Sequence, residues 1–563
     1  MSWLRLTAPP VPKMLVGAHR RSLTGSVSLA AILALVAGLS GQAPPRLTVR
    51  AAADSIRAAD LLRDITFLAS DELAGRATPS PGQDAAAAYV EQALRQAGVT
   101  PMGDAGGYQQ RYVVTRATLI PQETNLRMGD RTFAYGTDFV LTSFLAPGTS
   151  SGGVVYVGAG IRAPKLGLDP YGPLDVRGKW LLVHAPSNLP EGMTREMLGS
   201  AGADYMPAAQ EARSRGALGL LVIPAPQHLA TLDGVTPRPT TARDLNPSVG
   251  WAYAQQPLPH LTLSKAALEL LLQGERTSAD ALLGADTIRR YGPSFELSAA
   301  KTVTLRLAAE TSDTGAYNVI GIVEGSDPAL REEYITVSSH LDGAVGRGGG
   351  AGDTIYNAAD DNASGSSGNL AIARALMQGP RPRRSIVLIW DTGEETGLWG
   401  SRHIAYGPIS QKIVAHICVD MIGRTKQPGT SVPGEDELAG PAEVFVAGPG
   451  VLSTQMDGVL ARVAVEYPYV KQNRRFDLAT ESFFYPRTDA APYFERKIPY
   501  AEFFTGLHGD YHRPSDEVSK IDPAKMEAVS RTVYVMVSML ADDATRPRMD
   551  KPLPPNLIAL LAR

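Results

Sequence analysis

From residue 317 to about residue 450 the chain alternates short, almost wholly apolar segments with helical patterns. Five of these segments are typical of strands: YNVIGIVEG, EYITVSSH, RSIVLIW, IVAHICVDMI and AEVFVAG. Between them, SGNLAIARALM has the spacing of a helix. Strands that are apolar at nearly every position must be covered on both faces, as in the parallel sheets of α/β proteins. The pattern therefore predicts an α/β fold, with a mainly parallel central sheet and helices on both of its faces.

The preceding part of the chain predicts further elements. Two amphipathic helices are expected near residues 61–68 and 85–97, and alternating strands near 110–145. The segment APGTSSGG at 146–153 is rich in turn residues and predicts a linker. Residues 151–262 then show the order strand, strand, helix, strand. That order predicts a separate, small mixed α/β sheet with a covering helix.

The first 43 residues have the pattern of a secretory signal. A basic region ends at Arg20 and Arg21, the apolar run from Val27 to Leu39 follows, and the small residues SGQA come next. The run is shorter than the roughly 20 apolar residues that a membrane helix needs. A buried hydrophobic helix is the alternative interpretation. We expect an exported protein, periplasmic or extracellular, with no stable membrane span once the signal has been removed.

Charge and cysteine content narrow the function classes. The formal net charge is −3 and no dense basic cluster is present, so nucleic acid is not an expected partner. Cys418 is the single cysteine, which excludes an intramolecular disulfide and any metal site built from cysteines. Inside an apolar strand, its thiol is expected to be buried and inert. A metal ion in this protein would have to be held by His, Asp and Glu.

Polar residues follow the predicted strands. His340 and Asp342 come at the end of EYITVSSH, and Asp361 lies in NAADDNASG before a helix. Taken alone, the first pair could belong to a surface loop and the second segment could cap a helix. Glu394 and Glu395 follow RSIVLIW, and adjacent carboxylates repel each other unless a cation or a shared proton intervenes. One of them could bind a metal while the other takes a proton from metal-bound water, although two solvated loop acids are the alternative.

Two further segments complete the candidate site. Asp420 ends the strand HICVD, and GLHGDYHRPSDE supplies a dense cluster of His and Asp residues. The carboxyl ends of parallel strands lie at one edge of a sheet, where active sites form. Two imidazoles and three carboxylates suit two zinc ions, with one carboxylate bridging them. The residues expected to meet at this edge are His340, Asp361, Glu395, Asp420 and His512.

Taken in order, SSHLDG, NAADDNASG, GEETGLWGS, CVDMIGR and YHRPSD resemble the M28 family of zinc aminopeptidases. The resemblance runs from Tyr317 to near Ala541, and DITFLASDELAGRATPSPG near the start is similar to the family's lead-in. It implies two zinc ions per chain: one bound by His340 and Asp420, the other by Glu395 and His512, with Asp361 as the bridge. It also implies that Glu394 is the general base for the bridging water, and that Asp342 supports His340 from outside the ligand set.

The chain departs from the family pattern at one point. FFYPRTDAAPYF is similar to the family's Arg-Ser-Asp-His segment, but Ala490 stands where the histidine would be. No implied metal ligand is lost by this change, although substrate contacts in that loop are affected.

Residues 151–262 resemble a protease-associated domain, chiefly through RGKWLLV and GALGLLVI. The expected organisation has five parts: a signal peptide at 1–43, the N-terminal part of the peptidase domain at 44–145, the protease-associated insert and its connection at 146–300, the main zinc peptidase domain at 301–545, and a tail at 546–563.

The expected function is that of an exported two-zinc aminopeptidase acting on peptides. A single-zinc acyltransferase similar to glutaminyl cyclases is one alternative, and a non-catalytic receptor-like homologue is another. Dipeptidase and carboxypeptidase action, side-chain preference, the role of the insert and the oligomeric state are left open by the residues alone.

Overall fold

The computed structural model describes residues 46–144, 146–185, 189–199, 204–225, 232, 240–243, 258–343, 352–426, 438–477, 488–554, 557–558 and 561. The predicted signal at 1–43 lies outside these residues. Among the described residues, no helix combines the length and the apolar character that a membrane span requires.

A ten-stranded sheet forms the centre of the main domain. Its order is β10-β2-β14-β16-β15-β17-β20-β18-β19, and β1 pairs with β14. The bounds are β10 (Thr240–Arg243), β2 (Gln109–Leu119), β14 (Ala309–Val323), β16 (Ser385–Asp391), β15 (Tyr334–His340), β17 (Ile413–Val419), β20 (Tyr500–Phe504), β18 (Glu443–Ala447), β19 (Lys471–Asn473) and β1 (Thr100–Pro101). All five predicted strands are present, as β14, β15, β16, β17 and β18.

The middle of this sheet is parallel. β16, β15, β17 and β20 run in the same direction, and every residue of these four strands is buried. The predicted α/β fold is therefore confirmed. Toward its edges the sheet becomes antiparallel, because β14 runs against β16 and β18 runs against β20.

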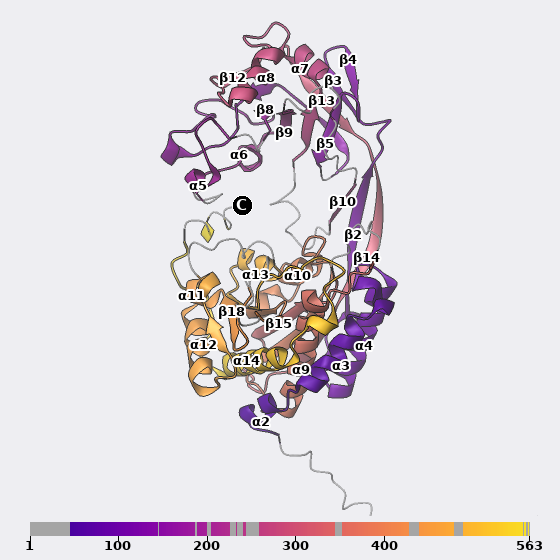
Figure 1. The fold of residues 1–563 in the computed structure, drawn as a ribbon, viewed down its shortest axis with the longest axis vertical. Coiled ribbons are helices and arrows are strands. Elements are labelled where there is room, and N and C mark those ends of the chain that lie inside the picture. Colours follow the sequence, from indigo (N-terminus) through magenta and orange to yellow (C-terminus); the bar gives the residue numbers. More distant parts are fainter. Residues whose placement is uncertain are drawn as a thin grey trace, which may run out of the picture. The chain divides into compact units, whose positions relative to one another are not determined.

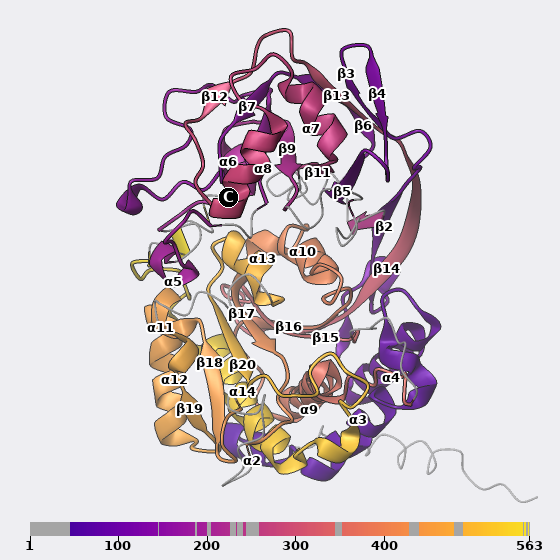
Figure 2. The ribbon, with the colours of Figure 1, turned by 45° about the horizontal axis from the view of Figure 1, so that its top comes forward.

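Helices cover both faces of the parallel strands. Figures 1 and 2 show β15 between α10 and α13 on one side and α9 and α14 on the other, in agreement with the residues that pack in each layer. The first layer contains α10 (Trp399–Ala405), α13 (Ala490–Glu495) and α11 (Pro449–Leu452). The second contains α2 (Val49–Asp54), α3 (Ala58–Leu68), α4 (Pro81–Ala97), α9 (Gly365–Gln378), α12 (Thr454–Glu466) and α14 (Pro523–Asp542).

The strand β20 was missed by the sequence analysis. It lies between β17 and β18 and carries Glu502 at its centre, with only 2% of that residue exposed. The Thr488 hydroxyl donates a hydrogen bond to Glu502 Oε2 at 2.8 Å, and burial raises the pKa of this carboxyl to about 8. Because a charged residue in the middle of a short segment suggests exposure, the sequence pattern did not predict this buried strand.

A second group of elements is built from residues 125–307. Its six-stranded sheet has the order β12-β7-β8-β9-β11-β5, and its four-stranded sheet has the order β4-β3-β13-β6. The first sheet comprises β12 (Phe295–Glu296), β7 (Val154–Tyr156), β8 (Trp180–His184), β9 (Gly219–Ile223), β11 (His260–Leu263) and β5 (Phe139–Ser143). The second comprises β4 (Arg131–Ala134), β3 (Asn125–Met128), β13 (Val303–Leu307) and β6 (Gly148–Gly152). The helices here are α5 (Arg195–Leu198), α6 (Ala208–Ser214), α7 (Lys265–Leu272) and α8 (Ala279–Ile288).

The predicted order strand, strand, helix, strand is present as β7, β8, α6 and β9. The three strands are parallel, and α6 packs against them through Ala208 and Ala212. The predicted linker at 146–153 is wrong in part, because Gly148–Gly152 forms β6 and pairs with β13. The backbone pairing with β13 outweighs the weak strand preference of these Gly, Ser and Thr residues.

Candidate two-metal site

The parallel strands bring the predicted site residues to one edge of the sheet. His340 is the last residue of β15, and Asp420 directly follows β17. Asp361 lies in the turn before α9, Glu395 in the loop after β16, and His512 in the loop after β20. Because β15 pairs in parallel with both β16 and β17, their carboxyl ends are level and their loops meet.

Five side chains form two groups that share one carboxylate. In the first, the His340 group, His340 Nε2 lies 3.1 Å from Asp361 Oδ1 and 3.3 Å from Asp420 Oδ1. In the second, the His512 group, His512 Nε2 lies 3.1 Å from Asp361 Oδ2 and 3.1 Å from Glu395 Oε2. The potential ligand atoms of each group lie within 4.8 Å of one another. Asp361 therefore presents a different oxygen to each group, which is the arrangement that a bridging ligand needs.

Several polar atoms at the centre of these groups are buried and, apart from one another, have no hydrogen-bond partner among the described residues. They include His340 Nε2, Asp420 Oδ1 and Glu395 Oε1. Buried polar atoms are normally hydrogen-bonded, and an exception calls for an explanation such as a bound ion. Imidazole nitrogen and carboxylate oxygen are ordinary zinc ligands, so this set of donors fits two divalent cations.

Without a cation, the carboxylates and imidazoles compensate one another. Burial alone would lower the pKa of His340, but the Asp420 and Asp361 carboxylates raise it well above its usual range. Burial alone would also lower the pKa of His512, whereas contacts with Asp361 and Glu395 raise it to about 10. Burial, assisted by the Asp361 charge, raises the pKa of Glu395 to about 7.

Asp342 contacts His340 through its backbone carbonyl rather than its carboxylate. The His340 Nδ1 atom lies 2.9 Å from the Asp342 backbone carbonyl oxygen, while the Asp342 carboxylate is 4.0 Å away. That carboxylate accepts hydrogen bonds from the backbone N–H groups of Glu394 at 3.2 Å and Glu395 at 3.4 Å. Asp342 therefore orients His340 with its backbone and the Glu394–Glu395 segment with its side chain.

Glu394 lies beside the ligand candidates and is partly buried. Burial raises the pKa of its carboxyl well above the usual range, and the neighbouring Glu395 carboxylate acts in the same direction. Its backbone is held by Asp342, so its position relative to Glu395 is set by the same loop. A carboxylate with raised proton affinity next to a ligand group is suited to proton transfer.

Arg76 is a buried residue at the site that the sequence analysis did not identify. Its side chain is fully buried and donates to the backbone carbonyls of Leu341 (2.8 Å), Asn357 (2.9 Å) and Ala358 (3.0 Å), and also to that of Leu68. Burial lowers its pKa to about 10, against the opposing effect of nearby carboxylates. Arg76 thus links the helical lead-in to the chain just after His340 and just before Asp361. The single arginine in DELAGR belongs to no sequence pattern that predicts this role.

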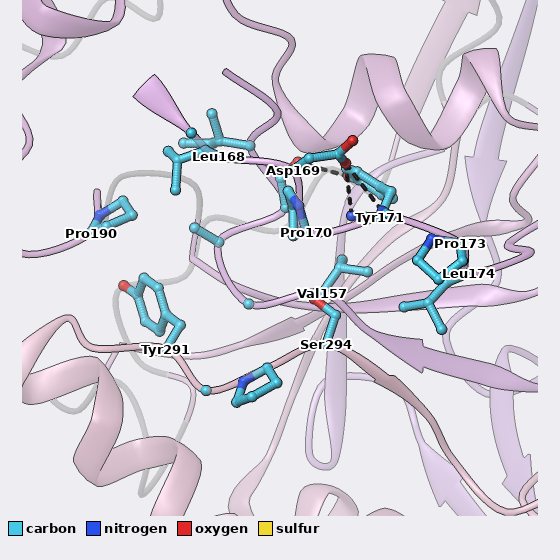
Figure 3. Close-up of a pocket in the computed structure, with 18 residues that line it drawn as sticks. Val157, Leu168, Asp169, Pro170, Tyr171, Pro173, Leu174, Pro190, Tyr291 and Ser294 are labelled. Atoms are coloured by element: carbon cyan, nitrogen blue, oxygen red, sulfur yellow. Dashed lines mark hydrogen bonds between the residues drawn. The ribbon is translucent and has the colours of Figure 1, made fainter. Parts of the chain in front are cut away.

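A separate cavity of about 630 Å³ lies in the second group of elements (Figure 3). It is lined by the loops after β7 and before β12, including Val157, Tyr171 and Tyr291, and by several prolines and glycines. Asp169 is the charged residue of this lining, and its carboxylate accepts hydrogen bonds from the backbone of its own loop, at Tyr171 and Gly172. None of the predicted site residues belongs to this cavity.

Two groups of potential metal ligands that share a carboxylate lie at the carboxyl edge of an α/β sheet, an arrangement that two-metal hydrolases use. Residues 318–537 match the model of Peptidase family M28. Over these residues, which are less than half of the chain, the sequence is similar to that family.

Solved structures with a similar chain trace include three bacterial proteins. An aminopeptidase from Aneurinibacillus sp. strain AM-1 is 18% identical, with a TM-score of 0.46 over 89% of this chain and 97% of that one. A zinc aminopeptidase from Bacillus subtilis is 17% identical, with a TM-score of 0.42 over 87% and 97%. A Peptidase M28 precursor from Shewanella amazonensis SB2B is 17% identical, with a TM-score of 0.40 over 90% and 97%. No curated protein matches the sequence.

Proposed function

We propose that this chain is an exported aminopeptidase that binds two zinc ions and releases N-terminal residues from peptides. The observation that carries the proposal is the shared carboxylate. Asp361 faces His340 with one oxygen and His512 with the other, and each pair is completed by a further carboxylate. His340 and Asp420 would hold one ion, Glu395 and His512 the other, and Asp361 both.

The residues of the chain have distinct tasks in this proposal. Zinc at such a site supplies Lewis-acid chemistry and lowers the pKa of water. Glu394 takes a proton from the attacking water and passes it to the leaving amine, a transfer that contributes about 10²–10⁴-fold to the rate in typical enzymes. Asp342 holds the backbone of Glu394 and Glu395 so that base and ligand keep their spacing.

Activity on unblocked and blocked substrates tests the reaction. Chromogenic amino-acid amides should be hydrolysed, the same amides carrying an N-acetyl group should not, and a chelator should abolish the activity. Hydrolysis of the blocked amides or release of C-terminal residues from peptides would refute aminopeptidase action. A peptide with N-terminal glutamine that is cyclised rather than hydrolysed would favour the cyclase-like alternative.

Zinc content separates the three functional alternatives. Two zinc ions per chain, measured by elemental analysis of the purified protein, support the two-metal peptidase. One ion would favour the cyclase-like reaction, and none would favour a receptor-like protein. Both ligand groups are complete among the described residues, which supports the first of these.

Export is tested by the mass of the mature protein. Secretion from a bacterial host should yield a chain that begins near Pro44, after the predicted signal at 1–43. An intact N-terminus in the cytosolic fraction would contradict this part of the proposal and leave the peptidase part untouched.

A further inference from the structure

A buried carboxylate beneath the candidate site joins two of the ligand loops. Asp516 is 1% exposed, and its Oδ2 atom accepts hydrogen bonds from the backbone N–H groups of Asp360 at 2.9 Å and Asp361 at 3.1 Å. Its backbone carbonyl accepts a third hydrogen bond from Ala359 N at 3.2 Å. The turn that carries the shared ligand Asp361 is thus held at three consecutive backbone positions by one residue.

Asp516 lies on the same loop as His512. The two residues are joined by a tight turn, in which Asp516 N donates to the Arg513 carbonyl at 3.1 Å. His512 itself has a φ of 56°, a left-handed conformation that non-glycine residues adopt only when their surroundings enforce it. The contact between Asp516 and the Asp361 turn therefore also helps to fix the loop bearing His512.

The loop bearing Asp420 joins the same network through Asp360. Asp360 is fully buried, and its Oδ1 atom accepts a hydrogen bond from Gly423 N at 2.7 Å. A Cβ atom at Gly423 would lie 2.9 Å from that oxygen, so the close approach requires glycine. Met421, directly after Asp420, has a φ of 50° and is also held in the left-handed region.

Arg424 and His508 lie next to the carboxylates of this network. The Arg424 guanidinium lies 3.8 Å from Asp516 Oδ1 and donates to His508 Nδ1 at 3.2 Å. His508 Nε2 in turn lies 3.3 Å from Asp360 Oδ2. The Arg424 guanidinium thus places a positive charge near the two buried carboxylates.

We infer that Asp516 is a positioning residue that sets the spacing between the two metal-binding groups. It holds the Asp361 turn and the His512 loop together, and through Asp360 it reaches the Asp420 loop. When the hydrogen bonds from the Asp361 turn to Asp516 are lost, Asp361 no longer presents one oxygen to each group at the right distance. The inference rests on the proposed two-zinc function, but its consequence is a change in zinc affinity and can be measured apart from catalysis.

The test compares Asp516→Ala with a matched variant elsewhere in the domain. Asp477 is also buried, and it accepts backbone hydrogen bonds from Gly448 at 2.9 Å and Gly450 at 2.7 Å, but these loops carry no ligand candidate. Both alanine variants remove a buried carboxylate that ties down a loop. They should therefore lower thermal stability in the presence of a chelator by similar amounts.

Zinc affinity separates the two variants. Competition with a chromophoric chelator should show about 10–100-fold weaker zinc binding for Asp516→Ala, as for other residues that orient ligands, and unchanged binding for Asp477→Ala. Asp516→Asn should recover most of the affinity, because an amide oxygen can replace the single oxygen that accepts both N–H groups.

Three outcomes of this experiment would overturn either the inference about Asp516 or the proposed function. Equal zinc affinity in Asp516→Ala and the unsubstituted protein would overturn the inference while leaving the proposed function intact. Equal losses of affinity in Asp516→Ala and Asp477→Ala would assign the effect to general destabilisation and overturn it as well. An unsubstituted protein that binds no zinc would instead refute the proposed function.

Discussion

The two ligand groups differ in how the chain holds them. In the His340 group, the side chains of His340 and Asp420 are 2% and 13% exposed, and both stand at the ends of buried parallel strands. In the His512 group, His512 is 39% exposed, and both it and Glu395 lie in loops. The sheet thus fixes one group directly, whereas the other depends on hydrogen bonds between loops.

This difference predicts that the two groups bind their ions with different affinities. Strand-anchored ligands need little rearrangement to bind a cation, while loop ligands must first be ordered, which lowers their effective affinity. We therefore expect the His340 group to retain its ion more tightly, and the His512 group to be more sensitive to changes in its loops.

The largest expected effect comes from a variant that leaves both groups intact. Glu394→Gln should lower kcat about 10²–10⁴-fold, because the amide cannot accept the proton from water. Zinc content should remain at the level of the unsubstituted protein, since Glu394 is not a proposed ligand. Steady-state kinetics and elemental analysis of the same preparation check both statements.

The matched control for Glu394→Gln is Glu395→Gln. That variant should lose zinc from the His512 group together with activity, so it differs from Glu394→Gln in metal content. If Glu394→Gln kept full peptidase activity, Glu394 would not be the base. If it lost zinc, the roles of the two glutamates would have to be exchanged.

The next effect concerns the anchoring of the His340 group by Arg76. Arg76→Met should lower the free energy of unfolding by about 2–5 kcal/mol, because several buried carbonyls lose their donor at once. The same change should weaken zinc binding, since the freed carbonyls flank His340 and Asp361. Chemical denaturation and zinc competition measure the two consequences.

Arg384 provides the comparison for Arg76. It is also fully buried and donates to Glu333 Oε2 at 2.8 Å and to the backbone carbonyls near the end of α14, away from the site. Arg384→Met should destabilise the fold by a similar amount and leave zinc affinity unchanged. A loss of zinc affinity in both variants would show that Arg76 has no particular connection with the site.

The contrast between ligands at strand ends and ligands in loops also explains which parts of the structure could be predicted from the sequence. The strands β15, β16 and β17 are mostly apolar and buried throughout. Their parallel packing and the meeting of His340, Asp361, Glu395, Asp420 and His512 therefore follow from pattern and order. The supporting contacts of the loops do not follow, since they depend on which atom of a residue faces its neighbour. Asp342, for example, contacts His340 through its backbone carbonyl and not through its carboxylate.

Contacts between residues that are far apart in the sequence could not be predicted from local patterns either. Arg76 reaches carbonyls more than 260 residues away, and nothing in its local sequence indicates a buried arginine. The strand β20 was not predicted because glutamate is a residue type that is usually exposed, although Glu502 is buried. In both cases a tertiary contact overrides what the local sequence indicates.

A smaller effect is expected for Asp342→Asn, and it should fall on one group only. Each carboxylate oxygen of Asp342 accepts a backbone N–H from the Glu394–Glu395 segment, and an amide can replace only one of them. Zinc affinity of the His512 group should fall about 10–100-fold, while the His340 group keeps its ion, because His340 contacts the unchanged carbonyl. Titration of the metal-free variant with zinc should show one site as before and one weakened.

The smallest expected effect is the difference between the two groups in the unsubstituted protein. Stepwise competition with a chelator should remove the ion of the His512 group first, with an affinity lower by about tenfold, or 1.4 kcal/mol. A cobalt-substituted sample can assign the order, since His512→Ala should abolish the first step and leave the second. Removal of both ions in one step, or retention of the ion near His512, would mean that anchoring by the strands does not control affinity. The shared ligand Asp361 would then couple the two groups so strongly that burial and loop position no longer distinguish them.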